Sequence, residues 1–272
     1  MEADRVIMAL GLTLLAGLST GIGSAMAFFA RRTSTRFLSI SLGFSAGVMI
    51  YVSFVELLAE ARHALQQTHG RIGGDYLTAG AFFGGLLVAA LIDRLIPAHE
   101  NPHEVRSVEQ MCAEEQGGEA GERRLMRTGM LAAVAIAVHN FPEGIASFAA
   151  ALSSPALGVS IAVAIAIHNI PEGIAVSVPI YYATGSRKKA FWYSFLSGLS
   201  EPVGALLGYA LLAVVFSDAV MGSLLAGVAG VMVFISLDEL FPAAREYGEP
   251  HLAIYGLIVG MAVMALSLLL VG

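Results

Sequence analysis

Two copies of one polar motif interrupt otherwise apolar stretches of the sequence. They read His139-Asn140-Phe141-Pro142-Glu143-Gly144-Ile145-Ala146 and His168-Asn169-Ile170-Pro171-Glu172-Gly173-Ile174-Ala175. In a helix, a His and a Glu four residues apart lie on one face, about one turn from each other. Imidazole combined with carboxylate suits zinc and its first-row neighbours, whereas oxygen ligands alone would suit magnesium or calcium. The paired motif therefore predicts a site for divalent transition metals, with Asn140 and Asn169 adding amide oxygens.

The proline of each motif adds backbone oxygen to the same region. Pro142 and Pro171 lack an N–H, so each frees one carbonyl of the preceding turn from its helical hydrogen bond. Glu201, in a later apolar segment, is followed directly by Pro202 and has the same combination of acid and freed carbonyl. Glu201 is therefore predicted as a third contributor to the metal site. The alternative is a protonated acid that is hydrogen-bonded to a neighbour.

Acids lie inside the apolar segments without any Lys or Arg at comparable depth. They are Glu56, Glu143, Glu172, Glu201, Asp238 and Glu239. An ionised side chain at the centre of a bilayer costs at least about 2.5–3.5 kcal/mol, so such residues indicate function. A bound metal ion would supply the missing positive charge, and protons would take its place in an empty site.

Three of these acids are displaced from the membrane centre. The expected helix directions place Glu56 in the outer half and Asp238 and Glu239 in the inner half. One acid on the outer side of the central site and two on its inner side predict a path for a cation, with Glu56 at the entrance and Asp238 and Glu239 at the exit. The alternative is that acids near helix ends simply reach interfacial water.

The composition indicates a membrane protein. Of the 272 residues, 57% are hydrophobic and only 13% are charged, against about 25% charged in a soluble domain. Each apolar run approaches or exceeds the roughly 20 residues that span a bilayer as a helix, and none alternates like a barrel strand. We expect one transmembrane domain over residues 1–272. The eight predicted spans are 6–30, 38–62, 76–96, 128–151, 157–183, 189–216, 220–243 and 251–271.

Net charge and cysteine content exclude other classes. The formal net charge of −6 offers no basic surface, so no nucleic-acid partner is expected. The single cysteine, Cys112, excludes an internal disulfide framework and a cysteine metal cluster.

A second repeat predicts the symmetry of the fold. Residues 46–57, in the second span, resemble residues 229–240, in the seventh. These spans cross the membrane in opposite senses, which predicts an inverted repeat of helices 1–3 and 6–8 around a central pair formed by helices 4 and 5. Twelve of the 15 Lys and Arg residues fall in the odd-numbered loops, including the long polar loop at about 97–127. By the positive-inside rule, that loop is cytoplasmic and both termini face away from the cytoplasm.

The paired motifs, the eight spans and the long third loop resemble the ZIP family of divalent-metal transporters, and most closely its bacterial zinc transporters. The resemblance covers nearly the whole chain. It implies uptake of Zn²⁺, with Fe²⁺, Mn²⁺, Cd²⁺ and Co²⁺ as further substrates, across the bacterial inner membrane, and often a homodimer. It also implies a binuclear site, with one ion at His139, Glu143, His168 and Glu172. The second ion would be held by Asn140, Asn169 and Glu201, with Glu143 and Glu172 shared. An elevator-like movement of helices 1, 4, 5 and 6 against helices 2, 3, 7 and 8 is implied as well.

Two other function classes stay open at this point. An intramembrane zinc hydrolase would use similar ligands, with a water in the fourth position and a separate general base. The sequence contains no His-Glu-x-x-His pair, and a duplicated symmetrical site favours passage of an ion over an enzyme. A channel or metal-gated receptor differs from a carrier only in kinetics, which the sequence does not record.

Overall fold

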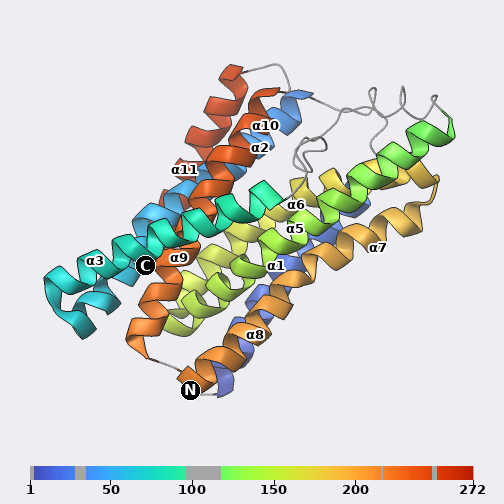
Figure 1. The fold of residues 1–272 in the computed structure, drawn as a ribbon. Helices are drawn as coiled ribbons and strands as arrows, with labels where there is room; N and C mark the ends of the chain where they lie inside the picture. The colour runs from blue at the N-terminus through green and yellow to red at the C-terminus, as the bar shows by residue number, and fades with distance from the viewer. Residues whose placement is uncertain (1–2, 28–34, 96–117, 216, 247–249, 272) are drawn as a thin grey trace.

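All the secondary structure that the structure describes is helical. The computed structural model describes residues 3–27, 35–95, 118–215, 217–246 and 250–271. The α-helices are α1 Ala3–Ala27, α2 Thr35–Val52, α3 Leu58–Leu95, α5 Glu119–Ser153, α6 Pro155–Thr184, α7 Arg187–Gly198, α8 Ser200–Val215, α9 Asp218–Ile235, α10 Phe241–Glu246 and α11 Pro250–Val271 (Figure 1). Two short π-helices, η1 Ser53–Leu57 and η3 Ser236–Leu240, lie between them. The prediction of an all-helical chain is confirmed.

Helices long and apolar enough to cross a membrane account for most of the predicted spans. In the described residues they are Ala3–Ala25, Ser39–Arg94, Pro155–Thr184, Asp218–Arg245 and His251–Leu269. Ser39–Arg94 takes in both the second and the third predicted span. The predicted spans 128–151 and 189–216 are helical as well, in α5 and in α7 with α8, as far as they are described. The chain is an integral membrane protein with several helical spans.

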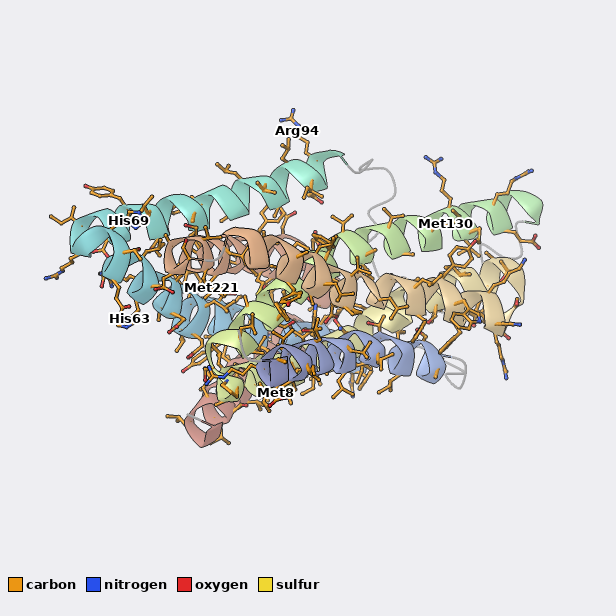
Figure 2. All side chains as sticks on the ribbon, turned by 90° about the horizontal axis from the view of Figure 1, so that it is seen from below. Met8, His63, His69, Arg94, Met130 and Met221 are labelled. Atoms are coloured by element: carbon orange, nitrogen blue, oxygen red, sulfur yellow. The ribbon has the colours of Figure 1, made fainter. Side chains whose placement is uncertain are left out.

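The chain turns within α3. Gly70 has φ 72°, a backbone conformation that glycine adopts without steric cost, and it divides α3 into two arms. Arg62 on the first arm donates to Asp75 on the second at 2.7 Å, and Gln66 donates to the same carboxylate at 2.6 Å. These contacts join the arms at the hairpin end of α3, where His63 and His69 also lie (Figure 2).

Both copies of the second sequence repeat contain a π-helix at the same register. Ser53-Phe54-Val55-Glu56-Leu57 forms η1, and Ser236-Leu237-Asp238-Glu239-Leu240 forms η3. The two are also packed reciprocally, since η1 contacts α9 and η3 contacts α2. A π-helix inside an α-helix widens the backbone spiral and is frequent at functional sites.

The helices form two bundles. The motif bundle consists of α1, α5, α6, α7 and α8, and the flanking bundle of α2, α3, α9 and α11 with the short elements beside them. In Figure 1 the helices of the motif bundle run side by side. A single cluster of buried apolar side chains, with Met49 of α2, Phe148 of α5 and Met232 of α9 among its members, extends across both bundles.

Glycines allow the closest approaches between helices, and these approaches fall within the bundles. A Cβ built on Gly47 of α2 would lie 2.0 Å from the carbonyl oxygen of Leu257 in α11, which only glycine permits. Likewise, a Cβ on Gly144 of α5 would lie 2.0 Å from the carbonyl oxygen of Glu201 in α8. Among the glycines that the structure describes, no such approach joins the motif bundle to the flanking bundle.

The long polar segment is shorter than the sequence suggested. Residues 97–127 were expected to form a loop, yet α5 begins at Glu119, so the last part of that range is helical. The remainder of the predicted loop, 97–117, lies outside the described residues.

Candidate metal site

The two repeated motifs meet where α5 and α6 pack along each other. Each motif lies inside its helix, and α8, which begins at Ser200, packs against α5. Six predicted site residues from these helices are at most 6% exposed: Asn140, Glu143, His168, Asn169, Glu172 and Glu201. The structure therefore brings together most of the polar groups that the sequence predicted as a central site.

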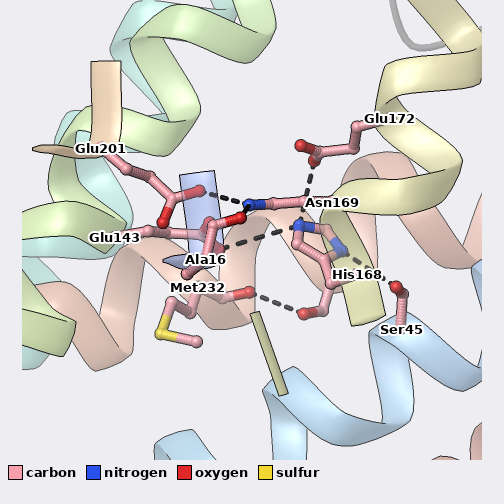
Figure 3. A network of polar contacts seen from close by, with 9 residues as sticks. Ala16, Ser45, Glu143, His168, Asn169, Glu172, Glu201 and Met232 are labelled. Atoms are coloured by element: carbon pink, nitrogen blue, oxygen red, sulfur yellow. Dashed lines mark hydrogen bonds and ion pairs between the residues drawn. The ribbon is translucent and has the colours of Figure 1, made fainter. Parts of the chain in front are cut away.

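The imidazole of His168 connects two carboxylates. Its Nε2 lies 2.9 Å from Oε1 of Glu172, one turn along the same helix, and 3.8 Å from Oε1 of Glu143 on α5 (Figure 3). Its Nδ1 lies 2.9 Å from Oγ of Ser45 on α2. The two ring nitrogens thus have different surroundings, carboxylates on one side and a hydroxyl on the other.

The amide of Asn169 connects three helices. Its Nδ2 donates to the carbonyl oxygen of Ala16 in α1 at 2.9 Å and also to Oε1 of Glu201 in α8. Its Oδ1 has no hydrogen-bond partner among the described residues. Asn169 therefore keeps an oxygen available while its nitrogen holds the neighbouring helices.

Asn140 has an unusual environment for a buried amide. It is 0% exposed, and neither its Oδ1 nor its Nδ2 has a hydrogen-bond partner in the part of the chain that the structure describes. Burying an amide without a hydrogen bond costs roughly 1–3 kcal/mol by mutational measurements. A metal ion beside Asn140 would give its oxygen a partner.

Among the described side chains of this site, acids outnumber the groups that can carry a positive charge. The site contains three buried carboxylates, those of Glu143, Glu172 and Glu201, and one described imidazole, which lies beside the first two. Every Lys and Arg whose side chain the structure describes is exposed. A dication is the simplest compensation for such an excess of buried acids.

The described side chains do not form a complete metal-coordination site. Among them, no group of three or more His, Cys, Asp or Glu side chains has metal-binding geometry. Ligand atoms around a tetrahedral zinc ion lie about 3.3 Å apart, as its bond lengths of roughly 2.0–2.1 Å require. The distances of 2.9 Å and 3.8 Å from His168 to the two carboxylates lie on either side of that value. Small side-chain shifts would therefore be needed to accommodate an ion.

The other predicted residues lie elsewhere. The side chain of His139 lies outside the described part of the structure, although the residue belongs to α5. Glu56 is half-buried in η1, while Asp238 is exposed and Glu239 half-buried in η3. The role of these three acids as a path for the cation stays a prediction.

Sequence reasoning missed two participants. Ser45 and the carbonyl oxygen of Ala16 contact the site from α2 and α1, more than a hundred residues before the groups they meet. Ser45 lies in the small-residue sequence Gly43-Phe44-Ser45-Ala46-Gly47, which indicates close packing but gives no sign of a polar contact.

Buried acids inside long apolar helices, with no buried Lys or Arg among the described side chains, define a membrane protein that handles cations. The sequence model of the family "ZIP Zinc transporter" matches residues 5–268, so the chain belongs to the ZIP zinc transporter family. This is a family of transporters and not of enzymes, which removes the hydrolase alternative.

Several bacterial relatives are similar over almost their whole length. The zinc transporter ZupT of Clostridium perfringens is 60% identical over 98% of this chain and 97% of its own. The zinc transporter ZupT of Nitratidesulfovibrio vulgaris is 62% identical over 99% of both chains. The corresponding protein of Lysinibacillus sphaericus is 58% identical over 98% of both.

Proposed function

We propose that this protein carries Zn²⁺ across the bacterial inner membrane into the cytoplasm through the site between α5, α6 and α8. The observation that carries the proposal is the buried cluster of His168 with Glu143 and Glu172, which has no buried Lys or Arg described beside it. Membership of the ZIP family and the names of the bacterial relatives support zinc as the substrate.

The donor set supports a binuclear site. One zinc ion would bind His139, Glu143, His168 and Glu172, and a second ion would use Asn140, Asn169, Glu201 and the two shared carboxylates. The amide of Asn140 and the Oδ1 of Asn169, which have no hydrogen-bond partner among the described residues, support the second position. Amide and carboxylate oxygens also suit harder dications, so Fe²⁺, Mn²⁺, Co²⁺ and Cd²⁺ are proposed as further substrates.

Transport by alternating access would move the motif bundle against the flanking bundle. The division into these two bundles supports the proposal. The motif bundle contains the predicted helices 1, 4, 5 and 6, and the flanking bundle contains the predicted helices 2, 3, 7 and 8, which are the two groups that the family resemblance implied. Within each bundle, glycines bring backbones into direct contact, whereas no glycine that the structure describes makes such a contact between the bundles, and one cluster of apolar side chains extends across both. The same proposal includes the inverted repeat, the single transmembrane domain, termini that face away from the cytoplasm and a homodimer. The π-helices at matching positions of the two repeat copies support the inverted repeat.

Uptake into proteoliposomes with an entrapped zinc indicator tests this function. We expect saturable, temperature-dependent uptake by the unaltered protein, and a loss of at least about 10–100-fold in His168→Ala and Glu172→Ala, since even outer-shell partners of a metal contribute that much. Ser160→Ala is the matched control, because Ser160 is buried in α6 and its Oγ has no hydrogen-bond partner among the described residues.

Two results would contradict the proposal. Undiminished uptake in both site variants would remove the ligand assignment. A flux that rises linearly with zinc concentration without saturation would favour a channel over a carrier.

A further inference from the structure

The imidazole of His168 is held by a residue that belongs to neither motif. Ser45 lies on α2, in the flanking bundle, and its Oγ is 2.9 Å from Nδ1 of His168. Each of the two residues is only 1% exposed, so water does not compete for this hydrogen bond. Figure 3 shows Ser45 on a different edge of the ring from Glu143 and Glu172.

The packing of α2 against α11 fixes the position of Ser45. Cβ atoms built on Gly43 and Gly47 would lie 2.2 Å and 2.0 Å from the carbonyl oxygens of Ala253 and Leu257 in α11. These two glycines share one face of α2, and Ser45 stands midway between them in sequence. At 3.6 residues per turn, Ser45 is about 200° around the helix from each glycine, so it faces away from α11 and toward α6.

The hydrogen bond has a chemical consequence for metal binding. A neutral imidazole binds a metal only through the nitrogen that carries no proton, and the hydrogen bond made by the other nitrogen selects the tautomer. In the tautomer with the proton on Nδ1, this N–H donates a hydrogen bond to Oγ of Ser45, and the Nε2 that faces Glu143 and Glu172 carries no proton. That is the nitrogen that a zinc ion between these carboxylates requires.

We infer that Ser45 is a positioning residue of the transport site, which holds the Nδ1–H tautomer of His168 and turns Nε2 toward the ion. The inference rests on the proposed function, since it treats His168 as a zinc ligand. The bond also joins α2 of the flanking bundle to α6 of the motif bundle. The orientation of the ring therefore depends on how the two bundles pack.

Zinc affinity provides the first test. Zn²⁺ binding to the purified full-length protein is measured by competition with a coloured chelator. Ser45→Ala should weaken binding by about 10–100-fold, the usual effect of removing an outer-shell partner of a metal ligand. Ser45→Thr, which keeps the hydroxyl, should stay close to the unaltered protein, and Ser160→Ala should not change the affinity. If Ser45→Ala does not fold, Ser45→Cys, which keeps the size and weakens the hydrogen bond, should show an intermediate loss.

The tautomer provides the second test, because a merely structural role would not alter it. Nitrogen-15 NMR of histidine-labelled, zinc-loaded protein should show an Nδ1–H, Nε2-metallated ring that is absent from His168→Ala. In Ser45→Ala this pattern should be lost or mixed with the other tautomer. An unchanged affinity, or a reduced affinity with an unchanged tautomer pattern, would overturn the inference.

The controls separate this failure from a failure of the proposed function. If the unaltered protein binds no zinc, or if His168→Ala binds zinc as tightly as the unaltered protein, the zinc-site assignment is wrong and the role of Ser45 falls with it. If His168→Ala loses binding and Ser45→Ala does not, only the role of Ser45 is wrong.

Discussion

Replacing Asn169 with Ala should loosen the junction of three helices beside the metal site. The Nδ2 of Asn169 donates to the carbonyl oxygen of Ala16 in α1 and to the carboxylate of Glu201 in α8. Both acceptors belong to residues that are 0% exposed, so water does not easily replace the missing donor. Asn169→Ala thus leaves two buried oxygens without this partner.

The size of the effect follows from the number and type of these bonds. Side-chain hydrogen bonds between membrane helices contribute about 0.6 kcal/mol on average and about 1.7 kcal/mol at most. The bond to Glu201 belongs at the upper end when that carboxylate is ionised, because charged acceptors form stronger hydrogen bonds. With two bonds lost, the free energy of unfolding should fall by about 1–3 kcal/mol.

Reversible denaturation in detergent micelles measures this change. The single tryptophan, Trp192, lies on α7, which packs against α1 and α6, so its fluorescence reports on the motif bundle. Ser160→Ala serves as the control that removes a buried hydroxyl without a hydrogen-bond partner among the described residues. An unfolding midpoint for Asn169→Ala equal to that of the unaltered protein would refute this account of the junction.

Three further predictions concern other parts of the chain. Gly47→Ala places a Cβ 2.0 Å from the carbonyl oxygen of Leu257 and should lower the free energy of unfolding by about 1–3 kcal/mol in the same assay. The control is Gly80→Ala, which has no atom within 4 Å of the new Cβ. Equal stability of the two variants would contradict the prediction. Glu56→Ala should raise the external zinc concentration needed for half-maximal uptake, and unchanged uptake kinetics would mean that Glu56 does not form the entrance. Asn140→Ala should reduce Mn²⁺ uptake more than Zn²⁺ uptake, because an amide oxygen is a hard ligand; equal losses of both would argue against a second ion position at Asn140.

Much of the candidate site could be predicted from the sequence because its signal is chemical and local. His168 and Glu172 are four residues apart in one helix, so their contact follows from helix geometry alone. The burial of Glu143 and Glu201 could also be predicted, because an acid inside a long apolar segment almost always faces the interior of the helix bundle. The likeness of residues 46–57 to residues 229–240 indicated related structures, although nothing in it predicted that both would contain a π-helix.

The sequence by itself determined that the chain forms apolar helices with a paired His and Glu motif in their middle. Only the tertiary structure decided which faces of those helices meet, and hence that Ser45 contacts His168 and that Asn169 joins Ala16 to Glu201. The physical reason is that a helix that is apolar on all sides carries no amphipathic stripe to mark its buried face. In such a helix, partners that are 123 or 153 residues apart are selected by side-chain shape and glycine contacts, which no local pattern records.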